Sequence, residues 1–250
     1  ANILSTYDDL IENNLKRIKL LEEAAQNIYR EWFVHFRFPG YETASWYVDD
    51  KGRRLPEGWR WSTFYEEVDI MSGGTPRTTE PLYWNGEIPF FTPTDASAIN
   101  HLYINSTEKT ITDTGLLNCN SQLYPKDTVF VTARGTVGKV RMAMRPMAMN
   151  QSCYALKMKN GDSQFLLLAM TLDSILQLKQ SAVGGVFDTI VVDTFKLIPI
   201  IVPNATIMEK FHMASQTLMN QTASLYSQII ILKEARDILL PRLMNRTIEL

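Results

Sequence analysis

Cysteine is scarce in this chain of 250 residues: Cys119 and Cys153 are the only two, and their spacing matches no metal-binding motif. We therefore expect a reducing, cytoplasmic setting. Long apolar runs are missing too, since stretches such as 198–202 and 229–232 fall far short of the roughly 18 residues that a membrane span needs. No signal-peptide pattern opens the sequence. These absences argue against a disulfide-rich secreted domain and against a membrane partner.

Charge of one sign is also lacking, because 25 Lys and Arg residues stand against 27 Asp and Glu residues, a formal net charge of −2. An anionic partner would have to be met by a local patch and not by the field of the whole molecule. Disorder is excluded in turn, since 45% of the residues are hydrophobic and 10% are aromatic. The length suffices for one large domain or for a medium one with extensions.

Catalytic motifs are absent. The sequence contains no G-x-x-x-x-G-K-S/T phosphate loop, no G-x-G-x-x-G turn, no H-E-x-x-H and no G-x-S-x-G. It also lacks the N/D-P-P-aromatic tetrapeptide expected of an adenine methyltransferase. His35, His101 and His212 lie far apart and are interpreted as surface or packing residues. The sequence therefore predicts no catalytic residue, no metal site and no cofactor for this chain alone.

Glycine and proline are missing from the first 36 residues, which predicts a long helix that stops at Phe38-Pro39-Gly40. Apolar residues recur in this segment at alternating steps of four and three, the pattern of a coiled-coil seam. The predicted seam positions are Tyr7, Ile11, Asn14, Ile18, Leu21, Ala25, Ile28 and Trp32.

A second long helix is predicted for residues 206–245, which contain no glycine and one proline, Pro241, expected to end or kink its last turn. Moving the first seam forward by 211 positions places it on Leu218, Thr222, Leu225, Ile229, Leu232, Arg236, Leu239 and Leu243. Because the two segments leave and re-enter one domain, we expect them to pair antiparallel. About 30 helical residues span roughly 45 Å.

The middle of the chain has a different sequence pattern from the two helical ends. Residues 127–132, 154–158 and 198–202 are β-rich runs between Gly, Pro, Asn and Thr, and residues 163–180 predict a helix. The predicted fold class is α+β, with a mixed domain over 38–204 between coiled-coil helices over 1–37 and 205–250.

Three polar segments of this middle domain are candidate binding loops. From Lys126 to Lys159 seven basic residues oppose one acid, hence a net charge of +6, which fits phosphate binding. A β-hairpin with solvated charges is the alternative interpretation. Residues 72–78, followed by Tyr83-Trp84, suit a nucleic-acid surface or an ordinary Ω-loop. Residues 181–189, with paired glycines, suit a ligand loop or a helix cap.

Together these segments resemble the specificity subunit of type I restriction–modification systems. The first helix, over residues 4–14, 20–26 and 28–33, resembles that family's central conserved region and is the most specific part of the match. The middle resembles a target-recognition domain at Gly74-Thr75-Pro76, Tyr83-Trp84, Ile88-Pro89, Thr94-Asp95, Arg134 to Gly138, Asn150-Gln151 and Gly184-Gly185. Residues 231–243 resemble the family's distal conserved helix.

The resemblance implies a non-catalytic subunit that reads half of a split double-stranded DNA target. It also implies that the helices dock methyltransferase subunits, which use S-adenosylmethionine, and that a translocating restriction subunit can join them. One recognition domain stands here between two conserved helices, where the family usually has two domains. The chain is therefore expected to be either a half-length subunit that forms a homodimer or a piece of a longer one.

The residues expected to contact DNA are polar, basic or glycine residues of the three segments. They are Ser72, Gly73, Thr75, Arg77, Tyr83, Trp84, Arg134, Gly135, Thr136, Lys139, Arg141, Asn150, Gln151, Gly184, Gly185 and Thr189. A rival interpretation is a coiled-coil assembly or adaptor protein whose β-rich middle binds protein or glycan. Salt-dependent retention on DNA distinguishes the two.

Overall fold

The structure, a computed structural model, describes residues 2–160, 163–181 and 189–244. It divides into two compact units, one formed by Ala1–Ile28 with Ala214–Leu250 and the other by Tyr29–Met213. The expected domain borders at 37/38 and 204/205 fall inside the second unit. Aromatic packing accounts for this, since Phe33 lies 5.1 Å from Phe211 and 5.6 Å from Trp59, measured between ring centroids.

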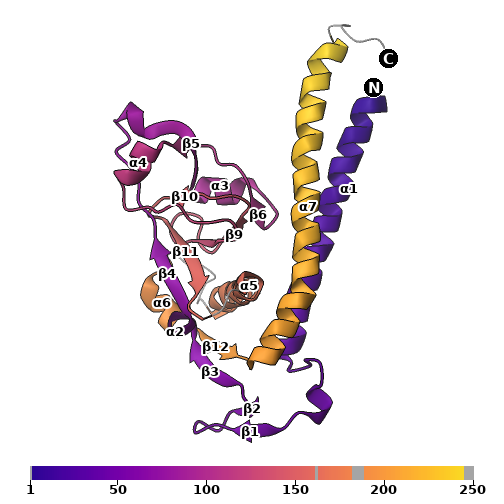
Figure 1. The fold of residues 1–250 in the computed structure, drawn as a ribbon, viewed down its shortest axis with the longest axis vertical. Coiled ribbons are helices and arrows are strands. Elements are labelled where there is room, and N and C mark those ends of the chain that lie inside the picture. Colours follow the sequence, from indigo (N-terminus) through magenta and orange to yellow (C-terminus); the bar gives the residue numbers. More distant parts are fainter. Residues whose placement is uncertain (1, 161–162, 182–188, 245–250) are drawn as a thin grey trace. The chain divides into compact units, whose positions relative to one another are not determined.

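The first unit is an antiparallel pair of long helices, α1 (Asn2–Tyr29) and α7 (Ala205–Met244) (Figure 1). Ile11 and Ile18 of α1 pack against Leu225 and Ile229 of α7. A hydrogen bond of 3.3 Å from Asn14 Nδ2 to Gln228 Oε1 crosses the same seam. The predicted fold class, α+β with two long antiparallel helices from the chain ends, is confirmed.

Burial along the seam follows the repeat read from the sequence. Ile11, Asn14, Ile18, Ala25, Thr222, Leu225 and Ile229 are buried, whereas Tyr7, Leu21, Ile28, Leu218, Leu232, Arg236 and Leu239 are half-buried. Charge plays a small part on α7, which has no Asp, Glu, Lys or Arg between Lys210 and Lys233. Closer to the end of α7, Arg236 forms an ion pair of 2.9 Å with Asp8 of α1.

Both helices end close to the expected places. α1 continues as a π-helical turn, η1 (Arg30–Val34), and Phe36 adopts a left-handed backbone with φ of 58°. α7 continues past Pro241, which lies in its last turn.

A five-stranded sheet forms the centre of the second unit, in the order β4-β11-β8-β9-β6. Its strands are β4 (Val68–Ser72), β6 (Tyr103–Ile104), β8 (Val129–Thr132), β9 (Val140–Ala143) and β11 (Cys153–Met158). All neighbours are antiparallel except β6 and β9. Helix α5 (Gln164–Ser181) packs against β8, β9 and β11. Two of the predicted β-rich runs thus become β8 and β11, and the predicted helix becomes α5.

Smaller elements surround this sheet. β10 (Ala148–Met149), β5 (Trp84–Phe91) and β7 (Thr110–Ile111) form a three-stranded sheet, and β12 (Pro199–Val202) pairs with β3 (Arg60–Thr63). β1 (Trp46–Val48) and β2 (Arg54–Pro56) form a hairpin. The short helices are η2 (Tyr41–Thr43), α2 (Phe64–Glu67), η3 (Pro81–Tyr83), α3 (Pro93–Ala98), α4 (Asp113–Leu117) and α6 (Val192–Lys196).

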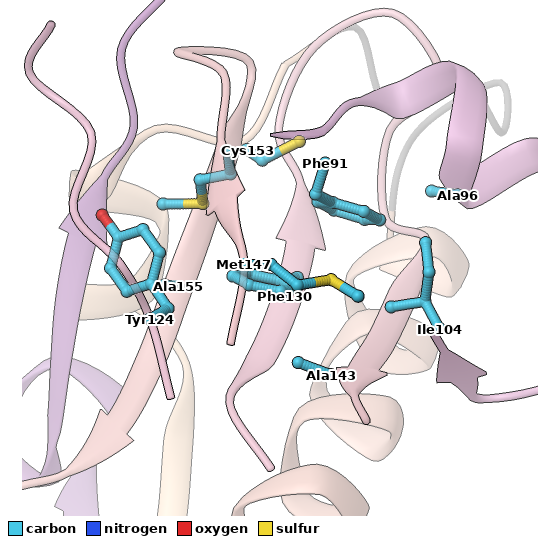
Figure 2. Packing of buried hydrophobic residues seen from close by; sticks show 10 residues of the cluster. Phe91, Ala96, Ile104, Tyr124, Phe130, Ala143, Met147, Cys153 and Ala155 are labelled. Atoms are coloured by element: carbon cyan, nitrogen blue, oxygen red, sulfur yellow. The ribbon is translucent and has the colours of Figure 1, made fainter. Parts of the chain in front are cut away.

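The core of the second unit is built around stacked phenylalanines. Phe91 of β5 lies parallel to Phe130 of β8 with ring centroids 4.9 Å apart, and Met147 and Cys153 pack beside them (Figure 2). Both cysteines are free thiols, and burial together with the charge of Asp95 raises the pKa of Cys153. Cys153 is therefore an inert packing residue. Within the described ranges, no helix combines the length and the apolarity needed to cross a bilayer.

We predict that Asn14→Leu raises the melting temperature of the chain, because the substitution replaces a buried amide in the seam by an apolar side chain. Circular dichroism measures the change. Asn13→Leu is the matched control, since Asn13 is exposed on the same helix and should leave the melting temperature unchanged. A lower melting temperature for Asn14→Leu would show that the pair with Gln228 stabilises the helices more than apolar packing does.

Candidate nucleic-acid interface

The loop between β8 and β9 presents an exposed basic side chain of the predicted segment, that of Arg134. Val131 faces Val140 across the hairpin, and Gly135 and Gly138 supply the positive φ angles of 76° and 71° that the tight turn requires. The Thr132 hydroxyl fixes the loop from inside, because it accepts the Lys139 N–H at 2.9 Å and donates to the Thr136 carbonyl. Arg134, Gly135 and Thr136 are left exposed on an ordered turn.

Strand register brings two further segments to the same end of the sheet. On β11, Cys153 is paired with Thr132 and Tyr154 is paired with Ser72. The residues that precede β11, that follow β8 and that follow β4 therefore lie together. This places Asn150-Gln151, Arg134 to Lys139 and Ser72 to Thr75 beside one another.

Glycine is needed where the segment after β4 touches the segment before β11. A Cβ on Gly73 would collide with the carbonyl oxygens of Met149 and Asn150, so the buried backbone there approaches too closely for any side chain. The Gly74 N–H donates to the Met149 carbonyl at 3.2 Å. Beyond the glycines, the Thr75 hydroxyl donates to Gln151 Oε1. Gly73 thus acts by allowing close packing, and Thr75 and Gln151 carry the exposed polar groups.

The segments with Arg134 and Asn150 border a polar cleft of about 480 Å³. Its lining combines residues that the sequence singled out with residues that it did not: Thr92, Pro93, Thr94, Glu108, Lys109, Arg134, Gly135, Asn150 and Ser152. The Ser152 carbonyl accepts the Ala133 N–H at 2.8 Å, and the Phe91 carbonyl accepts the Asn150 N–H at 3.0 Å. Backbone hydrogen bonds therefore hold the walls in place, while hydroxyl, amide and cationic groups face the opening.

Asp95 organises the wall opposite Arg134. Its buried carboxylate accepts the Thr92 N–H at 2.9 Å, the Thr92 hydroxyl at 2.6 Å and the Glu108 N–H at 2.7 Å. These bonds cap α3 and tie the segment with Glu108 and Lys109 to it. Asp95 is a structural residue, and it positions Thr94 and Lys109 on the cleft.

The basic stretch from Lys126 to Lys159 does not form one continuous patch. Arg134 and Lys139 lie at the loop end of the sheet, whereas Lys157 and Lys159 belong to the opposite end of β11. Lys159 is engaged there, donating to the Tyr65 carbonyl at 2.8 Å. Only part of the net charge of +6 therefore serves the cleft.

The structure contradicts the DNA contact predicted for Arg141. The sequence predicts a DNA contact for Arg141, but it is 7% exposed, and its guanidinium donates to the carbonyls of Val140, Ala96 and Ile99, the first and last at 2.7 and 2.6 Å. Its place on β9 turns the side chain into the protein, where it joins α3 to the sheet. Arg141 is therefore a fold-stabilising residue and is not available to a ligand.

Other predicted residues lie outside the cleft or outside the described ranges. Arg77 is exposed, and its carbonyl accepts the Trp84 indole N–H at 3.1 Å. Trp84 packs edge-on against Phe90, and the backbone of Tyr83 packs against α4. Both residues therefore contribute to packing within the domain. Thr189 is exposed next to Ile190, whose N–H bonds to the Ala133 carbonyl at 2.9 Å. Gly184 and Gly185 lie outside the described residues.

The DNA contacts expected from the sequence did not include Thr94, Glu108, Lys109 or Ser152. In the sequence, the segment from Thr92 to Asp95 has the pattern of a helix N-terminus, and in the structure it begins α3. This pattern gives no indication that the segment also lines the cleft. Lys109 stands apart from the basic stretch in sequence. Only the pairing of β5 with β7 and β10 brings its segment beside Asn150 and Arg134.

Comparison with known proteins defines the class to which this fold and cleft belong. The family model of the type I restriction modification DNA specificity domain matches residues 56–230, more than half of the chain. The chain therefore belongs to this family, and the resemblance seen in the sequence is confirmed.

Two curated relatives are specificity subunits. One, of the type I restriction enzyme MjaIX of Methanocaldococcus jannaschii, is 25% identical over 252 residues that cover 98% of this chain and 56% of the relative. The other, of the HindI enzyme of Haemophilus influenzae, is 25% identical over 301 residues, 98% of this chain and 65% of the relative. The chain thus spans roughly half to two thirds of the length of these relatives.

A solved structure shares the fold. The S subunit of a type I restriction–modification system from M. genitalium matches with a TM-score of 0.61 at 14% sequence identity, over 96% of this chain and 58% of that chain.

We predict that Arg134→Ala and Lys139→Ala weaken binding to duplex DNA and flatten its salt dependence by about one ion for each phosphate that the variant no longer neutralises. If Arg134 reads a guanine edge instead, its removal costs about 1–3 kcal/mol and relaxes one target position. Fluorescence anisotropy at several salt concentrations measures both. Lys157→Ala is the control from the far end of β11. Equal affinities for all four proteins would support the hairpin with solvated charges.

For Arg141→Met we predict reduced stability and not a direct effect on DNA recognition. The substitution strips carbonyl groups of α3 and the following turn of their buried donor, which costs at least about 2 kcal/mol of unfolding free energy. Urea denaturation measures this cost, and exposed Arg145→Met is the control. Normal stability combined with weakened DNA binding would instead indicate that Arg141 contacts DNA.

Proposed function

We propose that this chain acts in the cytoplasm as the DNA-recognition subunit of a type I restriction–modification complex, in which its second unit reads half of a bipartite target. The chain supplies no chemistry of its own. Its partners supply methylation, with S-adenosylmethionine as methyl donor, and cleavage.

The observation that carries this proposal is the convergence of Arg134 and Asn150 at one polar cleft of a family-matched domain. The bonded pair of Thr75 and Gln151 lies on the segments next to them. Hydroxyl, amide and guanidinium groups are those that distinguish base edges in the major groove: arginine pairs with guanine, and asparagine or glutamine pairs with adenine. They stand here on an ordered scaffold, which base discrimination requires. The exposed cations Arg134 and Lys109 add attraction to the phosphates.

Half of a target, not a whole one, suits the organisation of the chain. One mixed unit lies between two long helices, in a chain that spans about half the length of its curated relatives. A second reader must come from another copy or from a second recognition domain. Two copies related by a two-fold axis would read a palindromic target, whereas two different domains would read unlike halves.

The helix pair supports the proposed docking of methyltransferase subunits. Leu10 and Leu20 of α1 and Ile231 and Ile238 of α7 are 45%, 64%, 64% and 56% exposed, because the seam does not use them. Exposed apolar side chains on long helices are suited to further helix packing. The same faces are available to a second copy of the chain.

The test is to express the chain together with an adenine methyltransferase subunit of a type I system and to map methylated adenines across a genome. We expect methylation at a bipartite site that requires both proteins and S-adenosylmethionine. Arg134→Ala should relax one position or lower occupancy of that site, while Lys157→Ala leaves the map unchanged. Methylation by this chain alone, or a map that is identical without it, would contradict the proposal.

A further inference from the structure

A cavity of about 180 Å³ lies within the second unit, on the residues that follow α1, on α5 and on β12. Its volume is several times the roughly 30 Å³ that one water takes in the liquid, so it has room for the end of a side chain. Tyr29, Phe33, Phe36 and Trp61 contribute aromatic surface to its walls. None of these residues belongs to the polar cleft.

One carboxylate faces this aromatic lining. Among the described residues that line the cavity, Asp173 alone carries a charge, and its side chain is 11% exposed. Gln177 Nε2 donates to its Oδ2 at 2.6 Å, and Arg30 Nε lies 3.9 Å from its Oδ1, at the outer limit of an ion pair. A carboxylate offers about four acceptor positions. Asp173 thus keeps capacity for a closer cation.

Aromatic walls around a carboxylate suit a guanidinium group in particular. Guanidinium is planar, weakly hydrated and stacks on aromatic faces, whereas an ammonium group is compact and strongly hydrated. The same domain already uses this chemistry, because Arg53 lies over Trp61 and Arg54 over Trp46, each 4.7 Å from the ring centroid.

The backbone that builds the cavity is unusual. Tyr29 leads into the π-helical turn that carries Phe33 and Val34, and π-turns are frequent at functional sites. Phe36, with a φ of 58°, holds a left-handed conformation that is unfavourable for a bulky residue. Both features bring aromatic side chains to the cavity wall, where a straight helix would carry them elsewhere.

We infer that this cavity binds a guanidinium group on an alkyl chain, with Asp173 as its counter-ion and the aromatic side chains as its walls. An arginine side chain of a partner protein and a free alkylguanidine share this chemistry. The site goes beyond the proposed DNA recognition, since no residue of the polar cleft takes part in it.

The test titrates N-acetyl-arginine N-methylamide, a capped arginine, into the ¹⁵N-labelled full chain and follows the indole N–H resonance of Trp61, assigned with Trp61→Phe. We expect saturable shifts. Capped citrulline, which has the same shape without charge, should bind at least about tenfold more weakly. Agmatine is the probe for a free metabolite: tighter binding of capped arginine would indicate a protein side chain, and tighter binding of agmatine a small molecule.

Variants locate the site. Asp173→Asn should lower affinity for capped arginine at least about tenfold, whereas Asp193→Asn, which removes an exposed carboxylate on α6, should not change it. Arg30→Ala should raise affinity, because it removes the competing cation. Since a buried Asp also supports folding, Val34→Trp is the second test: Val34 is 44% exposed at the cavity, and the larger ring should block entry.

Equal binding of capped citrulline, or binding that persists in both Asp173→Asn and Val34→Trp, would overturn the inference. DNA affinity provides the separation from the proposed function. Asp173→Asn should bind duplex DNA normally, and Arg134→Ala should bind capped arginine normally, so either idea can fail while the other stands.

Discussion

The pairing register of β11 is the constraint on which the arrangement of the loops around the polar cleft depends. This strand pairs with β4 on one side and β8 on the other, and the pairs of Tyr154 with Ser72 and of Cys153 with Thr132 decide which loops meet. A slip by one residue would turn Cys153 and Ala155 out of the core and carry Gln151 away from Thr75. In the observed register, the small side chains of Cys153 and Ala155 pack in the core cluster that contains the stacked rings of Phe91 and Phe130.

Around β11, the residues that stabilise the fold are different from those that are exposed to a ligand. Asp95 and Arg141 are both buried, and both form hydrogen bonds that hold α3 and its neighbours in place. Arg134, Thr136 and Gln151 are exposed and carry few structural duties. Substitutions on the second set change exposed groups at or beside the cleft without changing the hydrogen bonds that hold its walls.

How much of this could be predicted depended on the range of the interactions involved. The long helices were predictable because the lack of glycine and proline and the seam repeat are local properties, visible in residues 1–36 and 206–245. The loop with Arg134 was predictable because glycines between strands are also a local signal. The contrast between Arg134 and Arg141 was not, since it depends on carbonyls of Ala96 and Ile99, more than 40 residues away in the chain. The π-turn after α1 likewise follows from packing in the second unit, not from any helix signal in residues 30–34.

The scarcity of charge along α7 has a practical consequence. Its seam relies on apolar contacts and an amide pair, together with the ion pair between Asp8 and Arg236. Apolar association strengthens slightly in salts such as sulfate, whereas phosphate contacts made by exposed cations weaken steeply as salt is added. With DNA bound as proposed above, a high-salt wash should therefore release it while the helix pair stays assembled. Detachment from DNA and collapse of the architecture are then two separate events, set by different ionic conditions.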